Sequence, residues 1–197
     1  MATAARRLRE LLEAQPPDAA AIRAFLDGLS HAERLEAIRA LGGAGVQRRL
    51  WEAAKDAPRV TLDQLVPRDA GPLREVIWHG KNSLPAFTRF QKRFCRPARG
   101  DGTLWGYNEQ RLVRVVGPGY FVVHEDATRG AAIDYREVPP QGAPGWPPVT
   151  PNDAGLSYFV YRDMVDYLRR VSAHVLIGRA TKHGKDLENY FVLCREP

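Results

Sequence analysis

The sequence predicts an α+β protein in which a small bundle of short helices precedes an antiparallel β-barrel or strongly curved sheet. Three observations indicate this class. The first 57 residues show helical periodicity, about eight later segments are rich in Val, Ile, Tyr, Phe and Leu, and the last three segments follow one another too closely for parallel crossovers. We therefore expect a helical region over residues 1–57, a proline-containing connector over residues 58–72 and the barrel over residues 73–197.

The N-terminal region predicts three or four amphipathic helices. Ala4–Ala14 forms the first, and Asp18 can cap a second in which apolar residues recur at helical spacing. Ser30 and Glu33 form a capping-box pattern at the start of a third helix, and Gly45–Lys55 is the fourth. Because a bundle this small buries too little surface to be stable alone, we expect it to pack on the barrel or on a partner.

The connector predicts one more helical turn, Thr61–Arg68, and the strands follow it. The expected strands are Leu73–His79, Thr88–Cys95, Leu104–Asn108, Leu112–Val116, Tyr120–Glu125, Ala131–Val138, Met164–Val171, His174–Thr181 and Glu188–Arg195, with Leu156–Tyr161 as the segment that leads into the last three. Gly117-Pro118-Gly119 predicts a hairpin turn. Short strands of even spacing are typical of an antiparallel barrel.

Residues 139–151 predict a stiff loop, because six of these thirteen residues are proline. Trp146 lies in the middle of the loop. A long loop with an aromatic side chain can serve as a lid over a binding site, or it can be a connector whose Trp146 covers one end of the core. Both interpretations are open at this point.

The C-terminal half also carries a family resemblance. The segments that carry it are Gln91–Phe94, Met164–Val171, Leu176-Ile177-Gly178 and Tyr190–Leu193. Over residues 85–195 the chain resembles the lipocalin-like GXWXG family of bacterial proteins, although the Gly-x-Trp-x-Gly signature is not intact and Leu104-Trp105-Gly106 is its nearest match. The resemblance implies a lipocalin-like, calycin-type barrel and no particular reaction. The helical N-terminus lies outside it.

Composition limits the class of protein. The apolar fraction of 44% is that of an ordinary globular chain, and no apolar run approaches the roughly 18 residues of a membrane-spanning helix. Glu10 and Glu13 interrupt the region where a secretory signal needs an apolar core, so we expect a cytoplasmic protein without a membrane segment. Cys95 and Cys194 then predict buried thiols rather than a disulfide scaffold.

A small eight-stranded barrel has room inside for side chains or for one small ligand. Alternation along Met164–Val171 places Asp166 and Arg170 on one face, where they either face solvent or need a charged or polar partner inside the barrel. We expect non-catalytic binding of a small, partly apolar, anionic ligand. The candidate ligand-binding residues are Lys92, Arg93, Trp105, Tyr107, Tyr120, Tyr135, Trp146, Asp166, Arg170 and His174.

Two other functions are open. Lys81–Arg99 holds six basic residues and no acidic one, and its phenylalanines suit a nucleic-acid or protein interaction module. If this segment is a strand, however, Phe90, Lys92 and Phe94 share the face that the core also needs. The third function is a small barrel enzyme that uses Asp166 and His174 as acid and base.

Motifs for other chemistry are lacking in the sequence. No His or Cys spacing is typical of a zinc site, and no glycine motif for dinucleotide or nucleotide phosphates occurs. There is also no G-x-S-x-G nucleophile motif. We therefore expect no metal and no cofactor, and we favour a binding protein over an enzyme. A homo-oligomer is compatible with the sequence.

Overall fold

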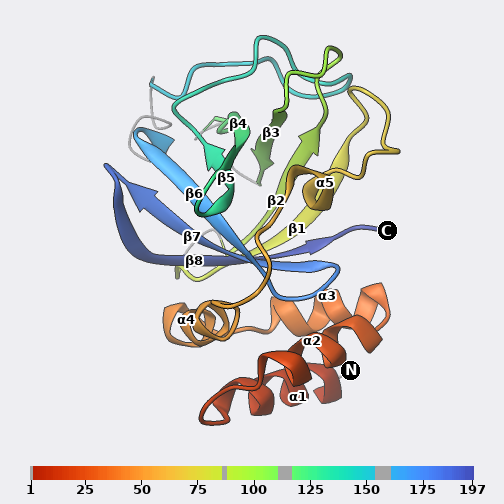
Figure 1. Cartoon of the computed structure of the whole chain (residues 1–197), viewed down its shortest axis with the longest axis vertical. Coiled ribbons are helices and arrows are strands. Elements are labelled where there is room, and N and C mark those ends of the chain that lie inside the picture. The colour runs from red at the N-terminus through yellow and green to blue at the C-terminus, as the bar shows by residue number, and fades with distance from the viewer. Residues whose placement is uncertain (1, 86–87, 111–116, 154–160) are drawn as a thin grey trace.

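The computed structural model describes residues 2–85, 88–110, 117–153 and 161–197. Within these residues it confirms the predicted class, with short N-terminal helices followed by a closed barrel of eight antiparallel strands (Figure 1). The helices are α1 (Ala2–Glu13), α2 (Ala19–Gly28), α3 (His31–Arg39), α4 (Ala44–Ala53) and α5 (Leu62–Leu65). The strands are β1 (Val76–Asn82), β2 (Arg89–Cys95), β3 (Leu104–Glu109), β4 (Phe121–Asp126), β5 (Gly130–Asp134), β6 (Met164–Arg170), β7 (Val175–Lys182) and β8 (Lys185–Arg195). Each strand pairs with the next along the chain, and β8 closes the barrel on β1, which is a lipocalin-like arrangement.

Several strand boundaries differ from the prediction, such as that of β8, which begins at Lys185 rather than Glu188, and two of the differences have a clear local cause. β1 begins at Val76 rather than Leu73, because Leu73 has a φ of 56° and belongs to a turn. β5 ends at Asp134 rather than Val138, because the Asp134 carboxylate accepts hydrogen bonds from the backbone and the guanidinium of Arg136 and so turns the chain. The predicted strand Leu112–Val116 and residues 156–160 of the lead-in segment lie outside the described residues.

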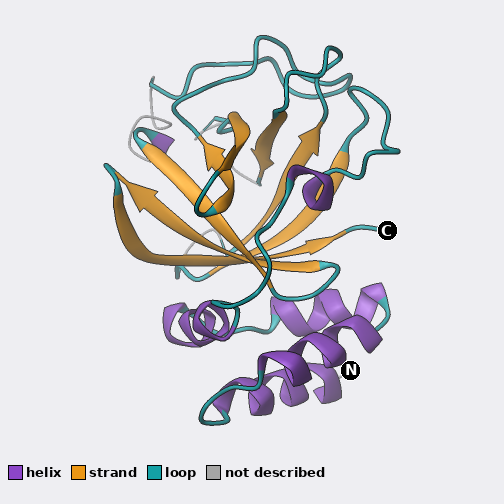
Figure 2. Cartoon of the chain, viewed as in Figure 1, coloured by secondary structure: helices purple, strands orange, loops and turns teal. Residues whose placement is uncertain are grey.

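Helices α1 to α4 form a layer on one side of the barrel (Figure 2). The sequence signals for their starts are confirmed: Asp18 accepts hydrogen bonds from two backbone amides of α2, and Ser30 and Glu33 form the complete capping box of α3. Apolar side chains of this layer pack against outward-facing residues of β7 and β8, such as Ile177 and Val192. The helical region therefore packs on the barrel, one of the two expected positions. No helix of the described residues is long and apolar enough to cross a membrane.

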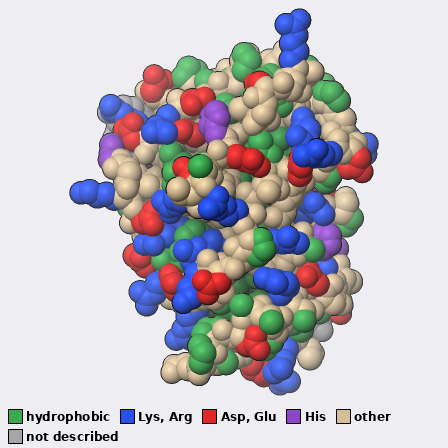
Figure 3. Space-filling model, in the orientation of Figure 1, with side chains coloured by type: hydrophobic (Ala, Val, Ile, Leu, Met, Phe, Trp, Pro, Cys, Tyr) green, Lys and Arg blue, Asp and Glu red, His purple; other side chains and the backbone are tan. Residues whose placement is uncertain are grey.

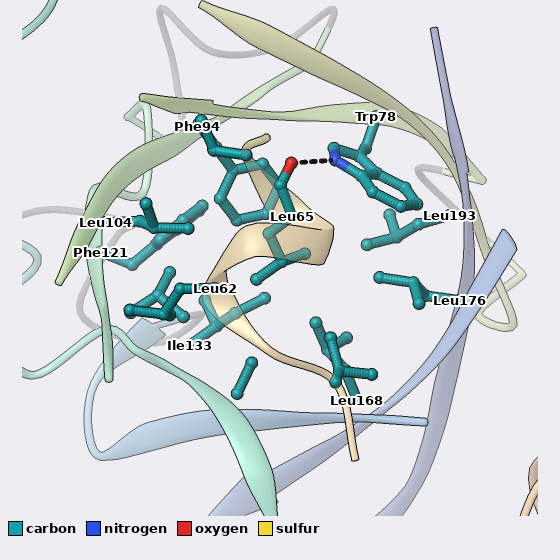
Figure 4. Packing of buried hydrophobic residues seen from close by; sticks show 14 of the residues in the cluster. Leu62, Leu65, Trp78, Phe94, Leu104, Phe121, Ile133, Leu168, Leu176 and Leu193 are labelled. Carbon is teal, nitrogen blue, oxygen red and sulfur yellow. Dashed lines mark hydrogen bonds between the residues drawn. The ribbon is translucent and has the colours of Figure 1, made fainter. Parts of the chain in front are cut away.

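Helix α5 lies inside the barrel and fills one end of it (Figure 4). Leu62 and Leu65 point into the apolar interior, and the indole N–H of Trp78 donates a hydrogen bond to the Leu65 carbonyl at 3.0 Å. Val60 and Val66, on either side of the helix, belong to the same core. Residues 58–72 are therefore more than the predicted connector, because they supply the apolar filling of the barrel at this end.

Candidate functional site

The barrel keeps a cavity at the end opposite α5. Its volume is about 170 Å³, and it lies between the later residues of β1 and β3 and the first residues of β2 and β6. The walls are mainly apolar and include Phe90, Tyr161, Met164, Ala180 and Phe191. The floor is formed by four polar side chains, which are Lys92, Asn108, Tyr135 and Asp166. An apolar cavity with a few converging polar groups is the usual form of a small-molecule site.

The four floor residues form a closed hydrogen-bond network. Lys92 Nζ donates to Asn108 Oδ1 at 3.0 Å and to Asp166 Oδ2 at 3.2 Å, and it also donates to the Tyr135 hydroxyl oxygen. The Tyr135 hydroxyl accepts from Asn108 Nδ2 at 3.1 Å and donates to Asp166 Oδ2 at 3.1 Å. The side chains of Lys92 and Asp166 are only 2% and 5% exposed. Each ammonium proton therefore has a protein partner in a site that is nearly closed to bulk water.

Burial shifts the titration of these groups toward their uncharged forms. Removal from water lowers the pKa of Lys92, and the nearby Asp166 carboxylate opposes this change only in part. Removal from water also raises the pKa of Asp166 and raises the pKa of Tyr135 well above its usual value. The lowered pKa of Lys92 and the raised pKa of Asp166 both favour transfer of a proton from the ammonium to the carboxylate.

Aromatic rings surround the Lys92 ammonium. Its nitrogen lies 4.8 Å from the ring centroid of Phe191, 5.0 Å from that of Tyr135, 5.1 Å from that of Phe121 and 5.7 Å from that of Phe90. The negative faces of such rings attract a cation when it is within about 6 Å. The rings therefore compensate part of the hydration that Lys92 loses on burial.

Three of these rings each lie across a glycine of a neighbouring strand. The pairs are Gly80 with Phe90, Gly106 with Phe121, and Gly178 with Phe191. A Cβ atom built on Gly178 would lie 2.1 Å from Phe191 Cζ, which is far inside contact distance. The glycines thus allow the rings to lie against the barrel wall. This arrangement leaves the space above Lys92 open.

The structure brings three of the predicted site residues together: Lys92, Tyr135 and Asp166 all reach the cavity floor. The alternation along β6 left open whether Asp166 faces solvent or the interior. It faces the interior, where its partner is Lys92.

The predicted aromatic residues Trp105, Tyr107, Tyr120 and Trp146 do not reach the cavity, and the prediction of a Trp146 lid or end cover does not match its position. They lie on the outer wall, where the Trp146 ring is 4.9 Å from that of Tyr107 and its indole N–H donates to Glu75 Oε2 at 2.6 Å. The reason is strand alternation, since Trp105 and Tyr107 alternate along β3 with residues that face inward. The proline-rich loop therefore covers the side of the barrel.

Arg93, Arg170 and His174 also lie away from the cavity. Arg93 faces outward and pairs with Glu75 at 3.1 Å. Arg170 is at the end of β6 beside the helical layer, beyond the inward-facing part of the strand. His174 precedes β7, and its Nδ1 lies 3.3 Å from an Arg195 nitrogen. The structure therefore does not place His174 beside Asp166 as the predicted acid and base would require.

Sequence reasoning missed several cavity residues, among them Asn108, Tyr161 and Phe191. For Asn108 a signal was present, because it lies four residues after Leu104 in the same strand and therefore shares the inward face with that apolar residue. For Phe191 the signal was its pairing with a glycine, and this pairing depends on strand register that one strand alone does not reveal.

No group of three or more His, Cys, Asp or Glu side chains within the described ranges is placed to hold a metal ion. Cys95 and Cys194 are free and buried, and burial raises the pKa of their thiols to about 12 and about 11. Neither cysteine is therefore ready to act as a thiolate nucleophile at neutral pH. Comparison of the chain with protein-family models and with curated proteins gave no match.

Proposed function

We propose that the protein binds a small, partly apolar ligand in the barrel cavity, with a polar group of the ligand directed at the floor. The observation that supports this most is the buried Lys92–Asp166 pair. A buried ion pair commonly contributes no more stability than well-packed apolar side chains of similar size would. Its presence beside an apolar cavity is therefore better explained by a ligand than by folding.

The size of the cavity limits the ligand. A dry engineered cavity of about 150 Å³ holds one benzene molecule, so the cavity of about 170 Å³ suits a single ring or a short chain of similar volume. A longer ligand would have to extend through the mouth of the barrel.

The charge balance of the floor bears on the ligand's charge. The sequence predicts an anionic ligand, but we propose an uncharged polar group, such as a hydroxyl, amide or carbonyl. Lys92 and Asp166 have opposite charges in contact, and each Lys92 proton is already bound to Asn108, Tyr135 or Asp166. An anion would meet the Asp166 carboxylate without a free cation to balance it.

The basic segment Lys81–Arg99 gives less support to a nucleic-acid interaction. The rings of Phe90 and Phe94 face the barrel interior and cannot stack on bases, while Phe87 lies outside the described residues. Lys92 is buried, and Arg96 pairs with Asp63 at 2.7 Å. On the face drawn in Figure 3, basic side chains are interspersed with acidic ones.

Calorimetric titration with phenol, benzyl alcohol and benzamide tests the proposal. We expect binding of at least one of these compounds and weaker binding of benzoate, which carries a negative charge. Ala180→Leu should abolish the binding, because Ala180 lines the cavity and the added atoms would fill it. Ala98→Leu is the matched control, since it makes the same change at an exposed site in the β2–β3 connection.

The titrations have clear alternative outcomes. If the folded wild-type protein binds none of the three neutral compounds, or if Ala180→Leu binds them as well as Ala98→Leu does, the cavity is not the proposed site. If benzoate binds more tightly than benzyl alcohol, the proposed neutral charge of the ligand is wrong.

A further inference from the structure

We propose that Lys92 forms a covalent imine with the carbonyl group of a small aldehyde or ketone held in the cavity. This inference rests on the proposed ligand-binding function and goes further by naming the chemical class of the ligand and the atom that bonds to it. Lys92 is one of five lysines in the chain. It projects from β2 into the cavity floor with an apolar wall above it.

The first requirement for an imine is an amine without its third proton. A lysine removed from water in an apolar pocket is a common nucleophile for carbonyl groups, because burial favours the neutral amine. Asp166 Oδ2 lies 3.2 Å from Lys92 Nζ and can accept the proton directly. The burial that lowers the pKa of Lys92 and raises the pKa of Asp166 assists this transfer.

The second requirement is a complete set of proton transfers, and Asp166 can supply them. When Lys92 Nζ attacks the carbonyl carbon, an N–C bond forms, the C=O π bond breaks, and the oxygen takes the proton held by Asp166. The nitrogen then returns one proton to Asp166. In the last step the nitrogen lone pair forms the C=N bond, the C–O bond breaks, and the hydroxyl leaves as water with that proton.

The net reaction consumes the ammonium and the carbonyl compound and yields a protonated imine and one water molecule. No oxidant or reductant is needed. The positive charge remains at the same nitrogen, so Asp166 stays its counter-ion and the rings of Phe121 and Phe191 remain near it. Tyr135 and Asn108 hold the nitrogen and the carboxylate in position, which makes them positioning residues.

Borohydride trapping tests this proposal with the full-length protein. The protein is incubated with benzaldehyde, reduced with borohydride and digested, and each lysine is examined by mass spectrometry for an added benzyl group. We expect Lys92 to carry about tenfold more label than Lys55 or Lys185, because these two lysines are exposed and do not line the apolar cavity that holds the aldehyde. Lys92→Arg should lose this label and keep the positive charge, whereas Lys185→Arg is the matched control that should keep it.

A folded protein in which benzaldehyde labels the exposed lysines and leaves Lys92 unlabelled overturns the imine proposal. Titration with benzyl alcohol, which has no carbonyl group, separates this failure from failure of the binding function. If benzyl alcohol binds while Lys92 stays unlabelled, the cavity binds ligands without covalent chemistry. A second variant keeps the test independent of changes at the ion pair, since Ala180→Leu should block labelling of Lys92 by closing the cavity.

Discussion

Removal of one member of the Lys92–Asp166 pair should destabilise the protein far more than removal of both. The two groups are 3.2 Å apart and almost fully buried, so Lys92→Met leaves a buried carboxylate and Asp166→Leu leaves a buried ammonium. Loss of one partner of such a pair costs about 3 to 5 kcal/mol, whereas replacement of both by apolar residues is often nearly neutral. In a chain of this length, about 3 kcal/mol lowers Tm by roughly 6 to 12 °C.

The pH dependence of the two single variants should have opposite signs. In Lys92→Met, burial raises the pKa of Asp166 above its unfolded value of about 3.9, so stability is highest below that pH and is lost as the pH rises through the raised pKa. In Asp166→Leu, burial lowers the pKa of Lys92 below its unfolded value of about 10.4. Stability is then highest above that pH and is lost as the pH falls through the lowered pKa.

Urea unfolding of the wild type, the two single variants and the double variant, followed by tryptophan fluorescence at about pH 5 and about pH 9, measures both effects. We expect Lys92→Met to be the more stable single variant at the lower pH and Asp166→Leu at the higher. A coupling energy below about 0.5 kcal/mol, which is the range for independent sites, would refute the reasoning. If the stability of the two single variants changes with pH in parallel, the reasoning is also refuted.

Three further substitutions test other parts of the structure. Gly178→Ala should push the Phe191 ring into the cavity, lower stability by about 1 to 3 kcal/mol in urea unfolding and abolish benzyl alcohol binding in calorimetry. Trp78→Phe should lower stability by about 1 to 3 kcal/mol, because the buried Leu65 carbonyl loses its donor, and a change below about 0.5 kcal/mol would contradict this. Trp146→Phe should leave ligand binding unchanged in the same titration, since Trp146 covers the outer wall, and a loss of affinity would restore the lid interpretation.

The overall fold could be read from the sequence because its signals are local. Short connections between strands indicate antiparallel neighbours, and the capping residues Asp18 and Ser30 indicate where helices begin. Neither of these signals requires knowledge of contacts between distant parts of the chain. The position of α5 could not be read in this way. A single helical turn that carries Leu62 and Leu65 has the same sequence pattern whether it lies on a surface or inside a barrel. Its place depends on the fit of Trp78 and other side chains from distant strands.

The site could be predicted only in part for a related reason. Alternation shows which residues of one strand share a face, and it grouped Phe90, Lys92 and Phe94 correctly. It does not show which inward residues of different strands meet, because that depends on the register of the whole barrel. The prediction of Trp105 and Tyr107 as ligand residues rests on residue type and not on strand face, and strand alternation places both on the outer wall.

The inside of the barrel is divided between two kinds of packing. At one end α5 and the apolar residues around Leu168 form a buried apolar core, whereas at the other end the rings lie against glycines beside a cavity over Lys92 and Asp166. Larger side chains in place of Gly80 and Gly178, with apolar residues in place of the ion pair, would give a filled core of the same kind at both ends. A barrel built only for stability has no need of this difference, so the polar, open end supports the proposed ligand-binding function.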